Sequence, residues 1–400
     1  MSDILKPETD DQVLEAVRWA SSGNAKILEI VGHATKRGLG RPVTADAVLD
    51  LSGLSGITLY EPEELVMTAR AGTSVAEVEA ALDDANQMMA FEPWSPLGLY
   101  GMQTGTHDSS GSGTVGGMFA AAVAGPRRPL VGSARDHMLG FHAVSGRGEA
   151  FKSGGRVVKN VTGFDLTKLM AGSMGTLAVM TDVSFKVLPK PEKSRTILVF
   201  GAGDPGQAMR AAQNSPYEVS GVAHLPVNVA TLSAVSYVQG AGAGVTAVRV
   251  EGPAPSVEVR CTALRELLSA YGEVEELHTT NTKTLWQEIR DVSYFAGDRQ
   301  VWRLSVTPSE GPGIAEYLNG EYFFDWAGGL IWLAMDPKDD AAAEQVRGAI
   351  ASGHATLMRA SDDVRRRVAV FQPQQGGIAQ LMKRVRAGFD PYGIFNPGRM

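Results

Sequence analysis

Apolar residues at helical spacing predict amphipathic helices in the first and last parts of the chain. In residues 7–23, apolar positions recur on one helix face until Gly23 stops the pattern. Ser74 and Glu77 form a capping-box pattern before a second apolar stripe over 75–82. A last helix, with its apolar residues on one face, ends at Asp390. The chain shows no internal repeat and no long low-complexity segment, and its 44% hydrophobic and 20% charged residues are normal for a folded soluble protein.

Short β-prone runs alternate with these helices and divide the chain. The predicted strands cover residues 27–31, 48–51, 65–70, 138–144, 175–188, 196–200, 245–250, 301–306 and 329–334, and further helices cover 114–124, 204–214, 255–271 and 341–352. Pro189 and Pro191 interrupt the pattern and indicate a domain boundary. We expect an α+β protein with a first domain over 1–192, a second over 193–372, and a C-terminal segment over 373–400 that returns to the first domain.

Composition narrows the functional classes. The 400 residues carry a formal net charge of −7, and no basic face stands out, which argues against a nucleic-acid partner. Cys261 is the single cysteine, so neither a disulfide framework nor an iron–sulfur cluster is expected within this chain. The first residues lack a signal-peptide pattern, and no apolar run reaches the roughly 20 residues of a membrane span. We therefore expect a cytoplasmic protein that reaches a membrane only through partners.

Three glycine-rich segments are the candidate ligand-binding loops. Residues 32–40 follow a predicted strand, residues 113–117 open a helix, and residues 172–177 lie between a helix and a strand. Glycines let backbone N–H groups approach an anion closely, and a helix start adds a positive partial charge. Each loop also has a structural alternative, namely an ordinary turn, close helix packing or a helix C-cap. The Gly-x-Gly-x-x-Gly spacing of a Rossmann dinucleotide site is absent.

The order of these segments is more specific than any of them alone. Gly113-Thr114-Val115-Gly116-Gly117 is followed by Gly125-Pro126-Arg127-Arg128-Pro129, Lys159-Asn160-Val161-Thr162-Gly163-Phe164-Asp165 and a Ser-x-Gly-Thr-Leu turn at 173–177. This string resembles the FAD-binding domain of the vanillyl-alcohol oxidase/PCMH family. With Asp325-Trp326, Gly353-His354-Ala355-Thr356 and the tail 389–399, the resemblance extends to the GlcE family of bacterial glycolate oxidase subunits and covers nearly the whole chain.

The resemblance implies a PCMH-type FAD-binding domain of two α+β subdomains, an α+β cap domain and a returning C-terminal helix. It places FAD on the residues Gly32, His33, Ala34, Thr35, Lys36, Gly113, Thr114, Gly116, Gly117, Gly172, Ser173, Gly175, Thr176, Val179 and Asn396. Thr35 stands where covalently flavinylated relatives have histidine, so non-covalent FAD is expected.

The chain departs from the family pattern in two places. The first loop, 31–36, has lost an arginine and two glycines of the usual Arg-Gly-Gly-Gly-Ser/Thr-Lys, which should weaken a phosphate cradle. A glycine-rich stretch between Pro96 and Ser112 also looks added. A scaffold subunit that has lost its cofactor is therefore an alternative hypothesis.

Candidate catalytic residues lie in the second domain. Oxidising a 2-hydroxy acid needs a base and a cation for the carboxylate, for which His354, Arg303 and Arg359 are candidates. Related D-2-hydroxy-acid dehydrogenases carry a metal motif, His-x-Gly-Asp-Gly-Asn-x-His, that is missing here, so no metal is expected. The resemblance then implies that a second FAD-binding subunit oxidises the substrate and that an iron–sulfur subunit passes the electrons on. A stand-alone FAD-dependent alcohol or hydroxy-acid oxidase is the remaining alternative.

Overall fold

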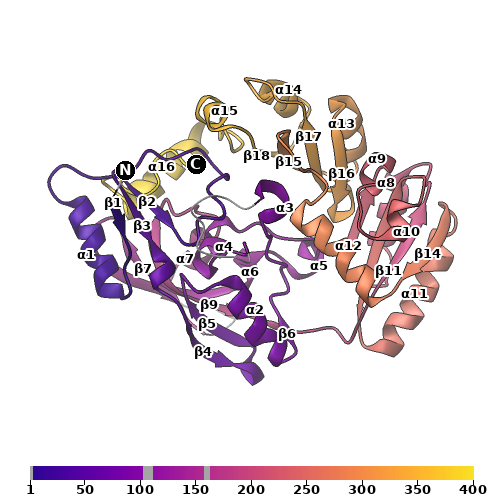
Figure 1. Cartoon of the computed structure of the whole chain (residues 1–400), viewed down its shortest axis with the longest axis horizontal. Helices are drawn as coiled ribbons and strands as arrows, with labels where there is room; N and C mark the ends of the chain where they lie inside the picture. Colours follow the sequence, from indigo (N-terminus) through magenta and orange to yellow (C-terminus); the bar gives the residue numbers. More distant parts are fainter. Residues whose placement is uncertain (1–2, 102–110, 157–162) are drawn as a thin grey trace. The chain divides into compact units, whose positions relative to one another are not determined.

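The computed structural model describes residues 3–101, 111–156 and 163–400, which form two compact units (Figure 1). The first unit comprises Met1–Ala124, Gly132–Pro189 and Pro373–Met400. The second comprises Gly125–Val131 and Lys190–Gln372. The architecture is α+β, as the sequence predicts. None of the helices within the described ranges is long and apolar enough to cross a membrane.

The first unit contains a small parallel sheet and a larger antiparallel one. The parallel sheet has the order β1-β3-β2, the antiparallel sheet has the order β4-β5-β9-β7-β8, and β10 pairs with β6. Its elements are β1 (Asp3–Leu5), α1 (Asp10–Ser21), β2 (Leu28–Val31), β3 (Ala47–Asp50), β4 (Ile57–Glu61), β5 (Val66–Arg70), α2 (Val75–Asp84), β6 (Gln87–Met88), α3 (Leu97–Tyr100), α4 (Val115–Ala121), α6 (Ala134–His137), β7 (Met138–Ser145), β8 (Ala150–Gly154), α7 (Leu166–Met170), β9 (Ala178–Lys186), β10 (Leu188–Pro189) and α16 (Gly376–Phe389).

The second unit is built on one antiparallel sheet of eight strands. The strand order is β14-β11-β13-β12-β16-β17-β15-β18. Its elements are α5 (Arg128–Val131), β11 (Lys193–Phe200), α8 (Pro205–Gln213), β12 (Gly221–Leu225), α9 (Val227–Ala230), α10 (Ser236–Gln239), β13 (Val245–Gly252), α11 (Ala254–Leu268), β14 (Glu273–Leu277), α12 (Thr279–Asp291), β15 (Gln300–Val306), α13 (Gly311–Leu318), β16 (Glu321–Asp325), β17 (Leu330–Met335), α14 (Ala343–Gly348), β18 (Gly353–Arg359) and α15 (Asp362–Arg367).

Alternation along the strands sorts the second unit's sheet into two faces. Trp302 and Leu304 of β15 join a core formed with α8, α11 and α13, whereas Arg303 between them points to the opposite face. On that opposite face α12 packs against β11, and the Trp286 indole donates to the Thr196 hydroxyl at 2.9 Å.

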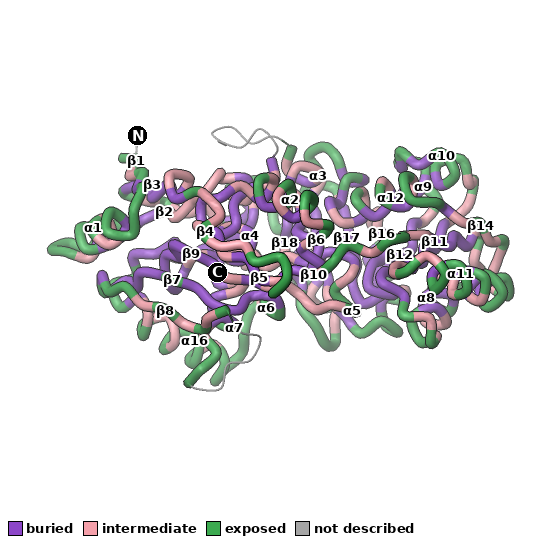
Figure 2. Tube along the Cα trace, turned by 90° about the horizontal axis from the view of Figure 1, so that it is seen from below, coloured by how far each residue is buried: buried purple, intermediate pink, exposed green. Residues whose placement is uncertain are grey.

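The amphipathic patterns predict the helices of the first unit well. In α1, Val13, Val17 and Ala20 are fully buried and the Thr9 side chain accepts from Gln12 N at the helix start. The central strands β7 and β9 are buried, while α16 is exposed along much of its length (Figure 2). The helix predicted over 114–124 ends earlier, at Ala121, because Ala122 adopts a left-handed conformation with φ of 50°.

Candidate functional site

A pocket in the first unit brings together segments that are far apart in the sequence. Its empty volume is about 760 Å³, including the part open to solvent, which falls in the range of small-molecule sites. It is lined by Ile30, Val31, Gly32, His33, Ala34, Thr35, Lys36, Arg37, Leu51, Ala71, Thr114, Gly116, Gly117, Ala120, Ala121, Met174, Gly175, Ala178, Met180, Asn396 and Arg399. The lining therefore joins the loop after β2, the start of α4, the turn before β9 and the C-terminal tail.

The loop after β2 is held in a tight conformation. Gly32 lies so close to Thr114 that a Cβ there would approach the threonine hydroxyl to 2.2 Å, so glycine is required by packing. Ala34 has a φ of 58°, a left-handed conformation that costs an L-residue about 1–2 kcal/mol. Thr35 is buried, and its hydroxyl lies below Gly113, where an added Cβ would come within 2.7 Å. The altered loop thus keeps a tight turn, with strain at Ala34.

The two glycines of α4 serve different purposes. A Cβ on Gly116 would lie 2.9 Å from the Ala71 Cβ, so this residue allows close packing. A Cβ on Gly117 would meet only the Thr114 hydroxyl, at 3.2 Å, and Gly117 lines the pocket. The Thr114 hydroxyl accepts from Gly117 N at 3.2 Å and caps the helix. Gly117 is therefore the position at which a larger side chain would occupy the pocket.

The C-terminal tail closes one wall of the pocket. The Asn396 side chain accepts from Ile30 N at 3.0 Å and donates to Met174 O at 3.0 Å, so it joins the strand before the first loop to the turn before β9. Asp390 accepts from Ile394 N and Phe395 N at 3.1 and 2.8 Å and fixes the turn that places Asn396. The C-terminal tail therefore holds the strand before the first loop and the turn before β9 together through Asn396.

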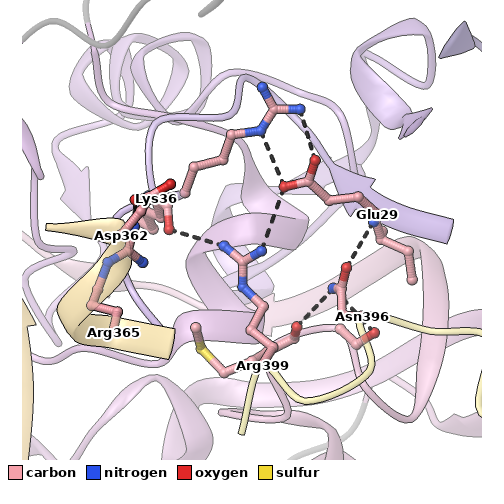
Figure 3. Close-up of polar contacts among 10 residues, drawn as sticks. Glu29, Lys36, Asp362, Arg365, Asn396 and Arg399 are labelled. Atoms are coloured by element: carbon pink, nitrogen blue, oxygen red, sulfur yellow. Dashed lines mark hydrogen bonds and ion pairs between the residues drawn. The ribbon is translucent and has the colours of Figure 1, made fainter. Parts of the chain in front are cut away.

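Two arginines of this wall meet at the Glu29 carboxylate (Figure 3), and Lys36 is a third cationic residue in the pocket lining. Arg37 binds Glu29 through two hydrogen bonds of 3.1 and 3.0 Å. Arg399 approaches the same carboxylate at 3.6 Å and donates to Lys36 O at 3.3 Å. With the Lys36 ammonium, the wall carries more positive than negative charge and suits an anionic ligand group.

Ten of the fifteen residues that the resemblance assigns to FAD line the pocket, and five do not. Gly113 packs beneath the first loop, and Gly172 lies behind α4 near Ala122. The Thr176 hydroxyl donates to the backbone oxygen of Ser173 at 2.7 Å and completes the turn, while the Ser173 hydroxyl contacts Met170 Sδ at 3.8 Å. Val179 is fully buried in the core beside α1. Of the quoted motifs, Lys159–Thr162 and most of the stretch between Pro96 and Ser112 lie outside the described residues.

The predicted catalytic candidates lie in the second unit, on neighbouring strands. Arg303 is on β15, and His354 and Arg359 are on β18. The Arg359 guanidinium donates to Phe295 O at 2.6 Å and to Arg299 O at 2.8 Å, which fixes a loop. His354 is exposed. Burial and the charge of Arg128 lower the pKa of Arg303 to about 10 against the opposing effect of Asp325, so Arg303 stays cationic at neutral pH.

Several pocket residues were missed by sequence reasoning. Arg37 and Arg399 carry charge into the pocket, and Ala71, Met174 and Met180 provide apolar wall. Arg37 lies within the glycine-rich segment 32–40, and Arg399 lies in the tail 389–399. Both arginines could therefore have been predicted as pocket residues from these motifs. Met174 lies within the recognised segment 172–177, whereas Ala71 and Met180 belong to no motif, because pairing of β5 with β9 brings them together.

The chemistry of the pocket fits a nucleotide cofactor. One wall is cationic and glycine-rich, as a pyrophosphate requires, and the other is formed by small and apolar side chains that suit a ring. Gly117 leaves open the space that such a ligand would use.

Comparison with known proteins agrees with this geometry. Residues 2–154 match the model of a family described as an FAD binding domain. The glycolate oxidase subunit GlcE of Escherichia coli (strain K12) is 36% identical over 390 residues, which cover 97% of this chain and 96% of that protein. The chain belongs to the GlcE family. The glycolate oxidase subunit GlcD of Bacillus subtilis (strain 168) is a more distant relative of this GlcE-family chain, 26% identical over 49% of the chain and 39% of its own length.

Solved structures place the GlcE-family chain in the PCMH-type fold. A p-cresol methylhydroxylase structure matches 99% of this chain and 88% of its own length, with a TM-score of 0.70 and 15% identity. An alkyldihydroxyacetonephosphate synthase matches 98% of the chain and 76% of its own length, with a TM-score of 0.66 and 15% identity. At such low identity the likeness concerns the fold.

Proposed function

We propose that this chain is an FAD-binding subunit of a multi-subunit glycolate, or 2-hydroxy acid, oxidase. The observation that carries the proposal is the pocket in which the first loop, the start of α4 and the tail residue Asn396 meet. Membership of the GlcE family over nearly the full length supports the same assignment. Bound flavin would supply the capacity to accept electrons and pass them on.

The proposed roles of the pocket residues follow from their contacts. Lys36, with the backbone of residues 32–35, would hold the pyrophosphate, and Gly117 would leave room for it. Asn396 keeps the two flanking loops in register and borders the ligand. Thr35, buried in the loop, offers no imidazole for a covalent link, so the proposal includes non-covalent FAD. The second unit, from Lys190 to Gln372, would serve as the cap domain.

Division of labour within a complex completes the proposal. A second flavin subunit would oxidise the 2-hydroxy acid, and an iron–sulfur subunit, at the cytoplasmic face of the membrane, would receive the electrons. This chain would relay electrons or support assembly. A scaffold that has lost its cofactor remains a second candidate, and the strained Ala34 in the first loop is the observation that favours it.

Purification with and without partners tests this assignment. The tagged chain, isolated from its own host, should retain a second flavoprotein and an iron–sulfur protein, and this assembly should reduce an artificial electron acceptor with glycolate. The chain alone, loaded with FAD, should not turn glycolate over. Sustained turnover by the isolated chain would instead establish a stand-alone oxidase.

A further inference from the structure

Trp326 stands in a strained turn between β16 and β17 of the second unit. Trp326 and Ala327 have φ angles of 52° and 55°, so two consecutive residues with side chains adopt the left-handed conformation. Such residues cost roughly 1–3 kcal/mol each and persist where the surroundings hold them. Trp326 N donates to Asp325 Oδ1 at 2.7 Å, and the indole Nε1 donates to Gly125 O at 3.1 Å. The position of the ring is therefore fixed from both ends.

Two guanidinium groups lie against this one indole. The Cζ of Arg128 is 4.4 Å and that of Arg303 is 4.9 Å from the centre of the Trp326 ring. Arg303 also lies 5.9 Å from the Trp332 ring centre, and its Nε is buried with no hydrogen-bond partner among the described residues. Cation–π attraction offsets part of the repulsion between the two like charges. The charge of Asp325 also acts on Arg303 and opposes the lowering of its pKa by burial and by Arg128.

The segment Gly125–Val131 brings Arg128 to this place and is itself anchored. Arg127 binds Glu251 of β13 through two hydrogen bonds of 2.7 Å. Although burial raises the pKa of Glu251, Arg249 and Arg127 outweigh that effect and hold the pKa well below its usual range. This segment therefore contributes Arg128 to the second unit at a defined position, while Arg128 itself is exposed to solvent.

Polar groups of β18 share the sheet face on which Arg303 lies. Arg303 pairs with Thr356, and Ser305 pairs with His354, in the antiparallel register of β15 and β18. Directly opposed residues point to the same face, so a hydroxyl and an imidazole stand on the face of Arg303. Thr356 is partly exposed and His354 is exposed. The face thus offers hydrogen-bonding groups next to the two cations.

We propose that Arg128 and Arg303, placed on the Trp326 indole, bind the carboxylate of a small monocarboxylic acid. The planar guanidinium fork matches the two oxygens of a carboxylate. The assignment of the ligand to the 2-hydroxy acids rests on the proposed function, in which such an acid is the substrate of the whole complex; this chain would bind the acid without oxidising it. Thr356 and His354, on the same face, are the groups that would meet its hydroxyl. The site belongs to the second unit alone and does not require bound FAD.

Titration of the full-length chain with glycolate tests the site directly. Intrinsic tryptophan fluorescence should change saturably, since Trp326 and Trp332 border the site, and calorimetry should give the same dissociation constant. Ethylene glycol, which has the hydroxyls without the carboxylate, should produce no such change. Arg303→Gln and Arg128→Gln should each weaken glycolate binding at least tenfold, about 1.4 kcal/mol. Arg303→Lys, which keeps the charge but loses the fork, should fall between wild type and Arg303→Gln.

A matched control separates the site from general charge loss. Arg299→Gln removes the same charge from the same unit, where Arg299 pairs with Glu321 at 2.6 Å, and it should leave glycolate binding unchanged. Three results would overturn the proposal. They are a wild-type chain that shows no saturable glycolate binding, Arg303→Gln and Arg128→Gln variants that bind glycolate as tightly as wild type, and phosphate that binds more tightly than glycolate. If Arg303→Gln does not fold, Arg303→Lys and Arg128→Gln carry the test. Flavin content, measured separately by absorption, tests the proposed function. If the chain binds glycolate but no FAD, the carboxylate site is supported and the proposed function is rejected.

Discussion

At the residue scale, single backbone conformations decide what the first loop can do. The family resemblance of the sequence implies that His33 and Ala34 stand where glycines are usual, and it predicts a weaker phosphate cradle. The structure adds that Ala34 takes the conformation for which glycine is suited, with φ of 58°. The loop has therefore kept its shape at a cost in free energy. Gly32, in contrast, could not be replaced, because Thr114 occupies the space of its Cβ.

Replacing Ala34 by glycine should relieve this strain. We expect Ala34→Gly to raise the free energy of unfolding of the first unit by up to about 1 kcal/mol, the left-handed cost minus the entropy gained by the unfolded chain. The FAD affinity should rise with it. Urea unfolding and FAD titration measure both quantities. Ala120→Gly is the matched control, since Ala120 also lines the pocket but lies inside α4, where glycine should lower stability by roughly 0.5–1 kcal/mol. Destabilisation by Ala34→Gly would contradict this account.

At the element scale, the sequence predicts those helices and strands whose apolar pattern is regular. The helix α1 and the strands β7 and β15 follow their patterns closely. The helix α12 was not predicted, because threonine and asparagine fill its first turns and have low helix propensity. The strand β12 is not predicted by the sequence pattern, because it is buried on both faces and its apolar and polar residues do not alternate. Tertiary packing, which local patterns do not contain, determines such elements.

The same limit applies to the candidate site. The glycine-rich loops and the tail carry motifs, so their meeting at one pocket could be anticipated from the family resemblance. The grouping of Arg128, Arg303 and Trp326 could not, since these residues are distant in sequence and belong to no shared pattern. Nor could the sequence distinguish Gly116, which serves packing, from Gly117, which borders open space.

The buried His224 of β12 should make the second unit sensitive to acid. Burial lowers the pKa of His224 from 6.5 to about 4, and its Nδ1 lies 2.9 Å from the Thr246 hydroxyl. Between these pH values the unfolded chain binds the proton and the folded chain does not, so stability is complete above pH 6.5 and falls as the pH drops toward 4. The loss should reach about 3 kcal/mol. Urea unfolding of His224→Gln should show a smaller loss over this range, whereas the exposed His278→Gln should behave as wild type. Equal acid sensitivity of His224→Gln and wild type would count against this origin.

At the scale of the whole molecule, the two units divide the proposed tasks. The first holds a pocket that suits a nucleotide, and the second holds a pair of cations that suits a small carboxylate. Membership of the GlcE family spans both units, whereas the GlcD relative aligns with only 49% of the chain. Family membership therefore covers both units of the chain.

The visible absorption spectrum of the purified chain, after incubation with FAD and removal of free flavin, tests the central claim most directly. We predict a flavin band at close to one FAD per chain. We also predict that Gly117→Leu, whose side chain would enter the pocket, loses most of this band while remaining folded. Gly348→Ala, which has no heavy atom within 4 Å of its added Cβ, is the control and should bind FAD normally. A wild-type chain that stays colourless, or a Gly117→Leu chain with full flavin content, would contradict the assignment of this pocket to FAD.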